Sequence, residues 1–343
     1  MIYGVTDTNP GVGLGASRAE LIALYPRLGD LLTRAEAAFA RAWNGQPGFL
    51  TRAAQEVLSG RGKRLRPVTL LLSADCAGGA TDSSIAMASL VEIVHVASLI
   101  HDDVIDDALS RHGRRSAKDR WGNKVSVLLG DYLIASALNL LPSDDGHKYT
   151  LGLSRVAARM CAGQIDELRA AGRRLTEKEY LDIVLAKTGS LFSYSCESGA
   201  DTAGGPPELK KALAAFGESF GVAFQLADDV LDLVGTNGQS GKSEGRDLAE
   251  GKWTLPLILA YDRADDEARA GLASLLGPDT PSPGARDTAC EIVRATGAVD
   301  HCWARVNESL AAARDHLAAV PDCEAKQALL ALASDRFPMP VMT

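Results

Sequence analysis

Two five-residue acidic motifs occur in this chain. Residues 102–106 read DDVID and residues 228–232 read DDVLD. Side chains four residues apart lie about 5–6 Å apart on one face of a helix, so the first and last carboxylates of each motif point the same way. Like charges at this spacing repel, and a cation between them removes the repulsion. Mg²⁺ prefers oxygen ligands and commonly holds phosphorylated substrates through one or two carboxylates. The motifs therefore predict a magnesium site that clamps a diphosphate.

The residues before each motif are apolar. The first motif follows the run LVEIVHVASLI over 90–100, and the second follows FQLA over 224–227. A helix that is apolar around most of its circumference is buried inside a bundle. The simplest alternative, a solvated acidic helix end, does not fit these flanks. No pair of histidines offers a competing transition-metal site, so hard oxygen ligands favour Mg²⁺ over zinc.

Basic residues could bind the diphosphate directly, beside the magnesium that the acidic motifs are predicted to hold. The segment GRGKRLRP over 60–67 carries four cations within six positions. By itself this segment is equally consistent with a basic surface loop. Further cations are Lys187 and those of the segment GKSEGRDLAEGK over 241–252, and Gln225 lies three residues before the second motif. Together with the acidic motifs, these residues predict enough cations to bind two diphosphates.

Helices must position these side chains. Apolar residues recur at helical spacing along most of the chain, whereas the alternation typical of strands is almost missing, so no sheet is expected. The predicted helices include 83–107, 123–141, 176–198, 208–234 and 302–318. Glycine and proline clusters separate the helices, and no linker or repeat divides the chain. We expect a mobile tail over 1–17 and a single large domain over 18–343.

Composition excludes several classes of protein. The chain has 44 acidic and 36 basic residues and a net charge of −8, whereas a surface that binds nucleic acid would be positive. We expect no signal peptide and no membrane span, because neither a basic and apolar leader nor a run of about 18 apolar residues is visible. Reduced, buried thiols and a cytoplasmic location are expected, because the cysteines have no metal-site spacing. They are Cys76, Cys161, Cys196, Cys290, Cys302 and Cys323.

Six motifs between about residues 55 and 260 resemble, in the right order, those of the trans-isoprenyl diphosphate synthase (polyprenyl synthetase) family. They are GRGKRLRP, HVASLIHDDVIDD, GNKVSVLLGDYL, KTGSLF, FQLADDVLD and GKSEGRDLAEGKWTLPLI. The resemblance implies an all-α bundle of the isoprenoid synthase type around a deep central cavity, usually as a homodimer. It implies a prenyltransferase that condenses isopentenyl diphosphate with dimethylallyl, geranyl or farnesyl diphosphate. The product would be a longer all-trans polyprenyl diphosphate, with transient membrane contact during its release.

The resemblance also implies roles for individual residues. The Mg²⁺ ligands, for up to three ions bound with the substrate diphosphate, would be Asp102, Asp106, Asp228 and Asp232, supported by Asp103 and Asp229. The binding residues for isopentenyl diphosphate would be Lys63, Arg66, His95 and His112. Those for the allylic diphosphate would be Arg111, Lys187, Thr188, Gln225, Lys242 and Lys252. The residues implied for catalysis are Asp102, Asp103, Asp106, Lys187 and Asp228. The family usually has a second arginine at the position of His112, which predicts a weaker isopentenyl diphosphate site here.

Small residues before the first motif predict a long product. Ser98 lies one helical turn before Asp102, Ala97 is beside it, and Val94 follows one turn further. Each turn adds about 5.4 Å of depth, close to one isoprene unit. In the resembled family, aromatic side chains at positions 97 and 98 stop growth at short products. We therefore expect a product of C20 or longer, although the small residues could instead serve close helix packing.

Two other functions share some of these features. A class I terpene cyclase is also helical with an aspartate motif, but it needs no isopentenyl diphosphate site and usually lacks a second DDxxD. A non-catalytic subunit of a heteromeric prenyl synthase would be expected to lose acidic-motif residues. Both motifs and the basic segment over 60–67 are intact here. A prenyl elongation assay with labelled isopentenyl diphosphate discriminates the three.

Overall fold

The computed structural model describes residues 15–42, 48–58, 62–111, 114–141, 146–235, 245–276 and 284–334. These residues are almost entirely helical. The α-helices are α1 (Arg18–Leu24), α2 (Arg27–Arg41), α3 (Gly48–Leu58), α4 (Leu65–Cys76), α5 (Asp82–Ile105), α6 (Ala117–Ala137), α7 (Gly146–Arg169), α8 (Glu177–Val184), α9 (Ser190–Thr202), α10 (Pro207–Val234), α11 (Arg246–Ala249), α12 (Leu255–Arg263), α13 (Asp266–Leu275), α14 (Ala285–Ala295), α15 (Ala298–His316) and α16 (Glu324–Leu332). The other elements are the strands β1 (Ser110–Arg111) and β2 (Arg114–Arg115), the 3-10 turns η1 (Leu138–Leu140) and η3 (Leu317–Ala319), and the π-helical turn η2 (Leu185–Gly189).

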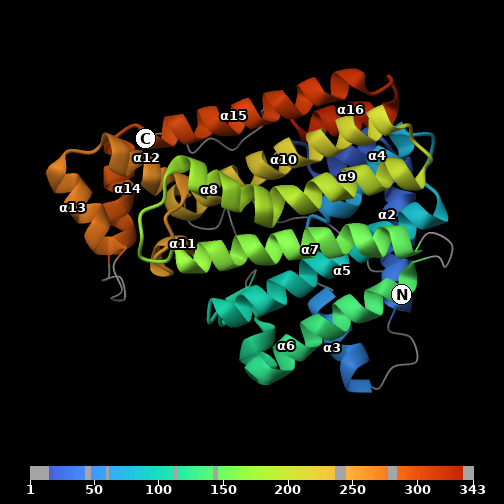
Figure 1. Ribbon diagram of the computed structural model, residues 1–343, viewed down its shortest axis with the longest axis horizontal. Coiled ribbons are helices and arrows are strands. Elements are labelled where there is room, and N and C mark those ends of the chain that lie inside the picture. The colour runs from blue at the N-terminus through green and yellow to red at the C-terminus, as the bar shows by residue number, and fades with distance from the viewer. Residues whose placement is uncertain are drawn as a thin grey trace.

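The long helices form a bundle. Figure 1 shows α15, α10, α9, α7 and α5 one below another with their axes roughly parallel, and α12, α13 and α14 gathered at one end. Helix α10 packs against α9 and α15, while α5 packs against α4 and α6. The buried side chains of these helices form one continuous apolar core. The fold is all-α, as the sequence predicts.

Helix α5 lies in the middle of this core. It begins with a capping box, in which the Thr81 side chain accepts a hydrogen bond from the Ser84 backbone and the Ser84 side chain accepts one from Thr81. Among the described helices, α5 is long and apolar enough to cross a membrane by composition alone, but 72% of its most apolar stretch is buried inside the protein. Burial on almost every side explains why its sequence has no polar face. The helix ends at Ile105, within the first acidic motif.

Helix α10 approaches α9 and η2 very closely, and glycines make this approach possible. A Cβ atom on Gly217 would lie 2.4 Å from the carbonyl oxygen of Phe192. A Cβ on Gly221 would lie 3.0 Å from the Cα of Gly189. A larger residue at either position would push the helices apart. This contact holds η2, which contains the predicted site residues Lys187 and Thr188, against the helix that carries the second acidic motif.

Several expectations from the sequence need correction. Helix α6 begins at Ala117 rather than at residue 123, and it contains a kink at Gly122, whose φ is +78°. A short hairpin of β1 and β2 follows the first acidic motif, where no strand was expected. The expectation of buried thiols is wrong for Cys161, which is exposed on α7, and Cys323 is only half-buried. The proposed tail over 1–17 lies largely outside the described residues; at its end, the Ala16 amide donates a hydrogen bond to the carbonyl of Ala331.

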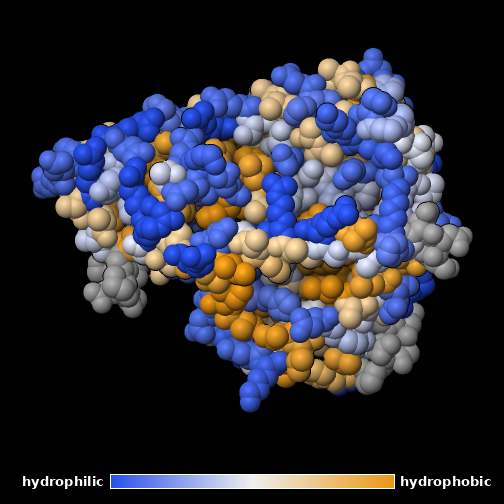
Figure 2. Space-filling model, in the orientation of Figure 1, coloured by the Kyte–Doolittle hydropathy of each residue, from blue (hydrophilic) through white to orange (hydrophobic). Residues whose placement is uncertain are grey.

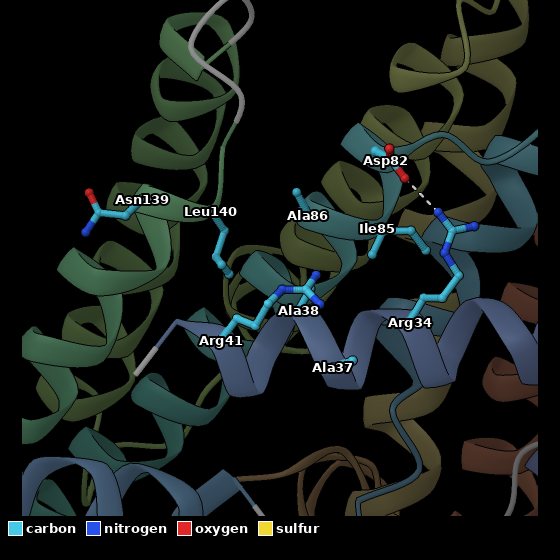
Figure 3. Close-up of a pocket in the computed structure, with 9 residues that line it drawn as sticks. All are labelled: Arg34, Ala37, Ala38, Arg41, Asp82, Ile85, Ala86, Asn139 and Leu140. Carbon is cyan, nitrogen blue, oxygen red and sulfur yellow. Dashed lines mark hydrogen bonds and ion pairs between the residues drawn. The ribbon is translucent and has the colours of Figure 1, made fainter. Parts of the chain in front are cut away.

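A cavity of about 560 Å³ lies between α2, the start of α5 and η1 (Figure 3). Ile85 and Ala86 form part of its wall, and Arg34 and Asp82 pair at its edge with 2.7 Å between the guanidinium and carboxylate. Ala86 lies sixteen residues before Asp102, so the cavity is about 24 Å along α5 from the first acidic motif. None of the predicted site residues lines this cavity.

Candidate active site

The first acidic motif occupies the end of α5. Asp106 is the residue that terminates the helix. Asp103 is almost fully buried, and its carboxylate accepts a hydrogen bond of 2.7 Å from the Nε of Arg111 on the hairpin. Burial raises the pKa of Asp102, and the nearby charges of Lys187 and Arg111 oppose this rise. The structure therefore brings two predicted diphosphate-binding cations close to the first motif.

The second acidic motif occupies the last turns of α10 and is held by a chain of hydrogen bonds. Asp229 accepts one from the hydroxyl of Tyr180 at 2.5 Å and one from the Gln225 side-chain amide at 2.7 Å. The Gln225 oxygen in turn accepts a hydrogen bond of 2.9 Å from the hydroxyl of Thr188. Burial raises the pKa of Asp229 to about 7. Thr188 and Gln225, both predicted to bind the allylic diphosphate, are thus fixed beside the second motif.

The short helix α11 connects the two motifs. The backbone amide of Asp247 donates a hydrogen bond of 3.1 Å to the carboxylate of Asp232. Arg246 reaches the first motif, with its guanidinium 3.2 Å from the carboxylate of Asp106. Lys252 follows α11 and lies 3.4 Å from the same carboxylate. The ends of α5 and α10 therefore meet across one segment, although they are far apart in the sequence.

The site is rich in buried negative charge. Burial, followed by repulsion from Asp229 and Asp232, raises the pKa of Asp247 well above its usual value. A buried carboxylate either takes up a proton, as the raised pKa of Asp247 favours, or is paired with a cation. In the part of the chain that the structure describes, no three acidic, histidine or cysteine side chains are arranged so that they could hold a metal ion among themselves. The residues that could hold a divalent cation are Asp102, Asp106, Asp228 and Asp232, because carboxylate oxygens are the ligands that Mg²⁺ prefers.

Two lysines share a carboxylate that the sequence analysis did not single out. The ammonium of Lys187 lies 2.5 Å from the carboxylate of Glu167 on α7. Lys252 lies 3.8 Å from Glu167 and 2.6 Å from Glu250. Burial alone would raise the pKa of Glu167, but the charges of Lys187 and Lys252 hold it below its usual value. The predicted lysines therefore form one cluster beside the first motif.

The predicted binding residues for isopentenyl diphosphate lie on α5 and around the start of α4. Arg66, in the first turn of α4, is buried and stacks on Phe192, with 4.5 Å between its Cζ and the ring centroid. Its Nε has no hydrogen-bond partner among the described residues, and burial lowers its pKa to about 10. Lys63 lies just before α4, and His95 lies on α5 seven residues before Asp102. A buried guanidinium with an unpaired N–H is a natural partner for an anion.

The remaining predicted residues divide into two groups. His112 and Lys242 lie outside the described residues, so their roles stay predictions. The three chain-length residues all lie on α5. Ala97 and Val94 are buried, whereas Ser98 is half-buried and its hydroxyl donates a hydrogen bond of 2.8 Å to the carbonyl of His95. Their effect on product length also stays a prediction.

Sequence reasoning missed several residues that organise the site. Glu92 offered a signal, because it is the one acidic residue in the run over 90–100 and lies three positions from His95, on the same helix face. Glu167, Tyr180 and Asp247 offered none that sequence periodicity could identify. Each is recognisable only from the partner that the fold brings to it.

Comparisons with known proteins agree with the fold and the motifs. A family model described as "Polyprenyl synthetase" matches residues 47–293, which is more than half of the chain. The chain belongs to the polyprenyl synthetase family. The resemblance seen in the six motifs is thereby confirmed, and the helical bundle is the isoprenoid synthase fold.

Individual members of the polyprenyl synthetase family match over most of the chain. The heptaprenyl diphosphate synthase component 2 of Geobacillus stearothermophilus is 34% identical over 92% of this chain and 97% of its own length. An all-trans-nonaprenyl-diphosphate synthase (geranyl-diphosphate specific) of Rhodobacter capsulatus is 36% identical over 81% of this chain and 85% of its own. The crystal structure of a polyprenyl synthase from Caulobacter crescentus, complexed with calcium and isoprenyl diphosphate, has a TM-score of 0.87 at 31% identity, covering 93% of this chain and 97% of that one. These relatives are named as prenyl synthases, which are prenyltransferases.

Proposed function

We propose that this chain is a Mg²⁺-dependent prenyltransferase. It condenses isopentenyl diphosphate head-to-tail (1'-4) with an allylic diphosphate and forms a longer all-trans polyprenyl diphosphate. The observation that carries the proposal is the connection of the two acidic motifs through α11, with Asp232 bonded to its backbone and Asp106 to its Arg246. The carboxylates of both motifs would hold the metal at this junction, and a diphosphate bound there would lie beside the ammonium groups of Lys187 and Lys252.

The charges of the site explain how the reaction would proceed. Asp102, Asp106 and Asp228 would hold the metal with support from Asp232, and bound Mg²⁺ supplies positive charge to the diphosphate. Lys187 and Lys252, with Arg111 on the hairpin, stabilise the negative charge that grows on the diphosphate as its bond to the allylic carbon breaks. The alkene of isopentenyl diphosphate then attacks the allylic cation, and a proton leaves to the departing diphosphate. The reaction would also require that water is kept away from the allylic cation, which it would otherwise quench.

The second substrate would bind beside the start of α4. Arg66 supports this assignment, because its buried guanidinium keeps an unpaired Nε–H. Lys63 lies just before α4, and His95 lies on α5, which packs against α4. Three groups that donate hydrogen bonds to phosphate oxygens can hold the isopentenyl diphosphate while its other end faces the allylic carbon.

The proposed product is C20 or longer, and the proposed assembly is a homodimer. Small residues at positions 97 and 98 support the proposed product length.

Exposed apolar residues on α6 and α7 support the proposed dimer. Figure 2 shows apolar surface gathered on the lower front of the molecule, over α5 to α7. The exposed large apolar residues of these two helices are Val127 and Leu128 on α6 and Leu151, Ile165 and Leu168 on α7. Because one relative is named as a component of a heptaprenyl diphosphate synthase, a heteromer is the alternative.

A single assay tests the reaction against its alternatives. The purified chain is incubated with Mg²⁺, farnesyl diphosphate and radiolabelled isopentenyl diphosphate, and the products are separated by chain length. A prenyl synthase incorporates label into longer diphosphates. A terpene cyclase instead consumes farnesyl diphosphate without incorporating label, and a non-catalytic subunit is inactive until a partner is added. Either of these last results overturns the proposal.

A further inference from the structure

Arg64 has an unusual backbone conformation immediately before α4. Its φ is +53° and its ψ is +35°, in the left-handed region. Asp107 is the one other non-glycine residue with positive φ in the described segments. This conformation is unfavourable for a residue with a Cβ atom, so it persists where surrounding contacts hold it in place. The contacts of the Arg64 side chain therefore determine the shape of the basic segment.

The side chain of Arg64 is buried and anchored on three sides. Its Nη1 donates a hydrogen bond of 2.5 Å to the carboxylate of Glu92 on α5, and its Nη2 donates to the carbonyl oxygen of Leu58 at the end of α3. Its Cζ lies 5.7 Å from the ring centroid of Phe39 on α2. Only 12% of the Arg64 side chain and 7% of the Glu92 side chain are exposed. Arg64 thus ties four helices together and is engaged within the protein.

Glu92 interacts both with this anchor and with the residues of the proposed isopentenyl diphosphate site. Its charge opposes the burial that lowers the pKa of Arg66, so its field reaches that guanidinium as well. It also lies three residues before His95, on the same face of α5. One buried carboxylate is therefore linked to Arg64 by contact, to Arg66 by charge and to His95 by helix geometry.

We propose that Glu92 is a positioning residue for isopentenyl diphosphate, acting through Arg64. This inference rests on the proposed function. By fixing Arg64 in its left-handed conformation, Glu92 sets the direction in which the chain enters α4. That direction places Lys63 and Arg66, on either side of Arg64, relative to His95. Glu92 also neutralises Arg64, so the substrate meets only the cations that face it. Neither Glu92 nor Arg64 is among the residues predicted to bind the allylic diphosphate.

The test compares three variants by the Michaelis constant for each substrate. Glu92→Gln keeps the shape and a hydrogen bond but removes the charge, and we expect the KM for isopentenyl diphosphate to rise about tenfold or more. The KM for the allylic diphosphate and the kcat at saturation should stay within about twofold. Glu92→Asp keeps the charge, so its KM for isopentenyl diphosphate should lie between those of wild type and Glu92→Gln. The matched control is Asp82→Asn, which breaks an exposed pair between α2 and α5, Arg34–Asp82, and should change neither KM.

Measurements of stability and of direct substrate binding distinguish a loss of folding from a loss of substrate positioning. Circular dichroism and thermal unfolding identify any variant that fails to fold, and Arg64→Lys, which keeps the charge but loses the forked hydrogen bonds, then replaces Glu92→Gln. A rise in both KM values, or a fall in kcat alone, overturns the positioning role. Calorimetric titration with isopentenyl diphosphate distinguishes a failure of the proposed reaction from a failure of the proposed positioning role of Glu92. A wild type that binds it in a Glu92-dependent way but does not elongate farnesyl diphosphate overturns the reaction alone. Normal elongation with Glu92-independent binding overturns the positioning role alone.

Discussion

The ammonium of Lys187 lies 2.5 Å from the carboxylate of Glu167, on a neighbouring helix of the bundle. Both side chains are largely buried, with 24% of Lys187 and 21% of Glu167 exposed. Gln164 donates a hydrogen bond of 3.3 Å to the same carboxylate. Lys187 belongs to a π-helical turn, a rare element that is frequently found at functional sites. The carboxylate of Glu167 therefore fixes the direction in which the Lys187 side chain points from this turn.

Glu167→Gln should therefore reduce turnover by roughly 10- to 100-fold, because Lys187 loses the charge that holds it beside the diphosphate. Steady-state elongation of the allylic substrate measures the effect. The control is Glu218→Gln, which weakens an exposed pair with Arg159 at 3.7 Å and should leave turnover unchanged. Normal turnover in Glu167→Gln would show that Lys187 does not need this partner.

The same ion pair predicts a pH dependence of stability. The pKa of Glu167 is lower in the folded protein than its ordinary value, because Lys187 and Lys252 outweigh burial. Its contribution to stability is therefore present above the unfolded pKa of about 4.3 and is lost as the pH falls through the lower folded value. The free energy of unfolding in urea should be higher for wild type than for Glu167→Gln at pH 7. This difference should shrink below about pH 4, and a constant difference would contradict the assignment.

Activity should require the first acidic motif. Asp102→Asn and Asp106→Asn are expected to lower turnover by at least about 10²- to 10³-fold, because they weaken the neutralisation of the leaving diphosphate. The helicity of both variants should persist, because Asp102 lies in the last turn of α5 and Asp106 lies just after it. Wild type should melt at a higher temperature with Mg²⁺ and inorganic diphosphate together, and the variants should lose this shift. Asp107→Asn is the control, because Asp107 is exposed and asparagine tolerates its positive φ.

Product length should depend on residues 97 and 98. Wild type is expected to form products of C20 or longer, and Ser98→Phe and Ala97→Tyr should each shorten them, because an aromatic ring there blocks a chain growing along α5. Chromatography against polyprenyl standards measures the length. Ser98→Ala, which removes only the hydrogen bond to the His95 carbonyl, should leave the length unchanged. A wild-type product of C15, or products that neither aromatic variant shortens, would contradict the proposal that residues 97 and 98 control product length.

The apolar face of α6 and α7 should be an interface between two copies of the chain. Leu128 has 67% of its surface exposed and adjoins the exposed Val127, and a contiguous exposed apolar patch commonly marks an interaction site. Leu128→Asp should convert the dimer to a monomer, because it would bury an unpaired charge at the interface. Light scattering after size exclusion gives the mass. Leu24→Asp, an exposed leucine on α1, is the control and should leave the mass unchanged; a monomeric wild type would contradict the proposal.

The sequence by itself determined the helical fold and the positions of the two acidic motifs. Helical periodicity is local, and a burial pattern repeated every three or four residues is legible without knowing any partner. The apolar run before Asp102 correctly predicted a buried helix with carboxylates at its end. Local signals were weaker at boundaries. They missed the early start of α6 and the kink at Gly122, because a helix start and a bend depend on capping and neighbouring packing.

Only the tertiary structure decided which charges meet. Arg246 and Asp106 are 140 residues apart in sequence, and no periodic pattern relates them. Arg64 could have been a solvated surface cation, but the fold buries it against Glu92, 28 residues away. The partner of an ionisable group depends on which helix packs beside it, and this packing is determined by the whole core rather than by neighbouring residues. The sequence therefore predicted which carboxylates and cations form the site, while the packing of α5, α7 and α10 set how these groups are paired.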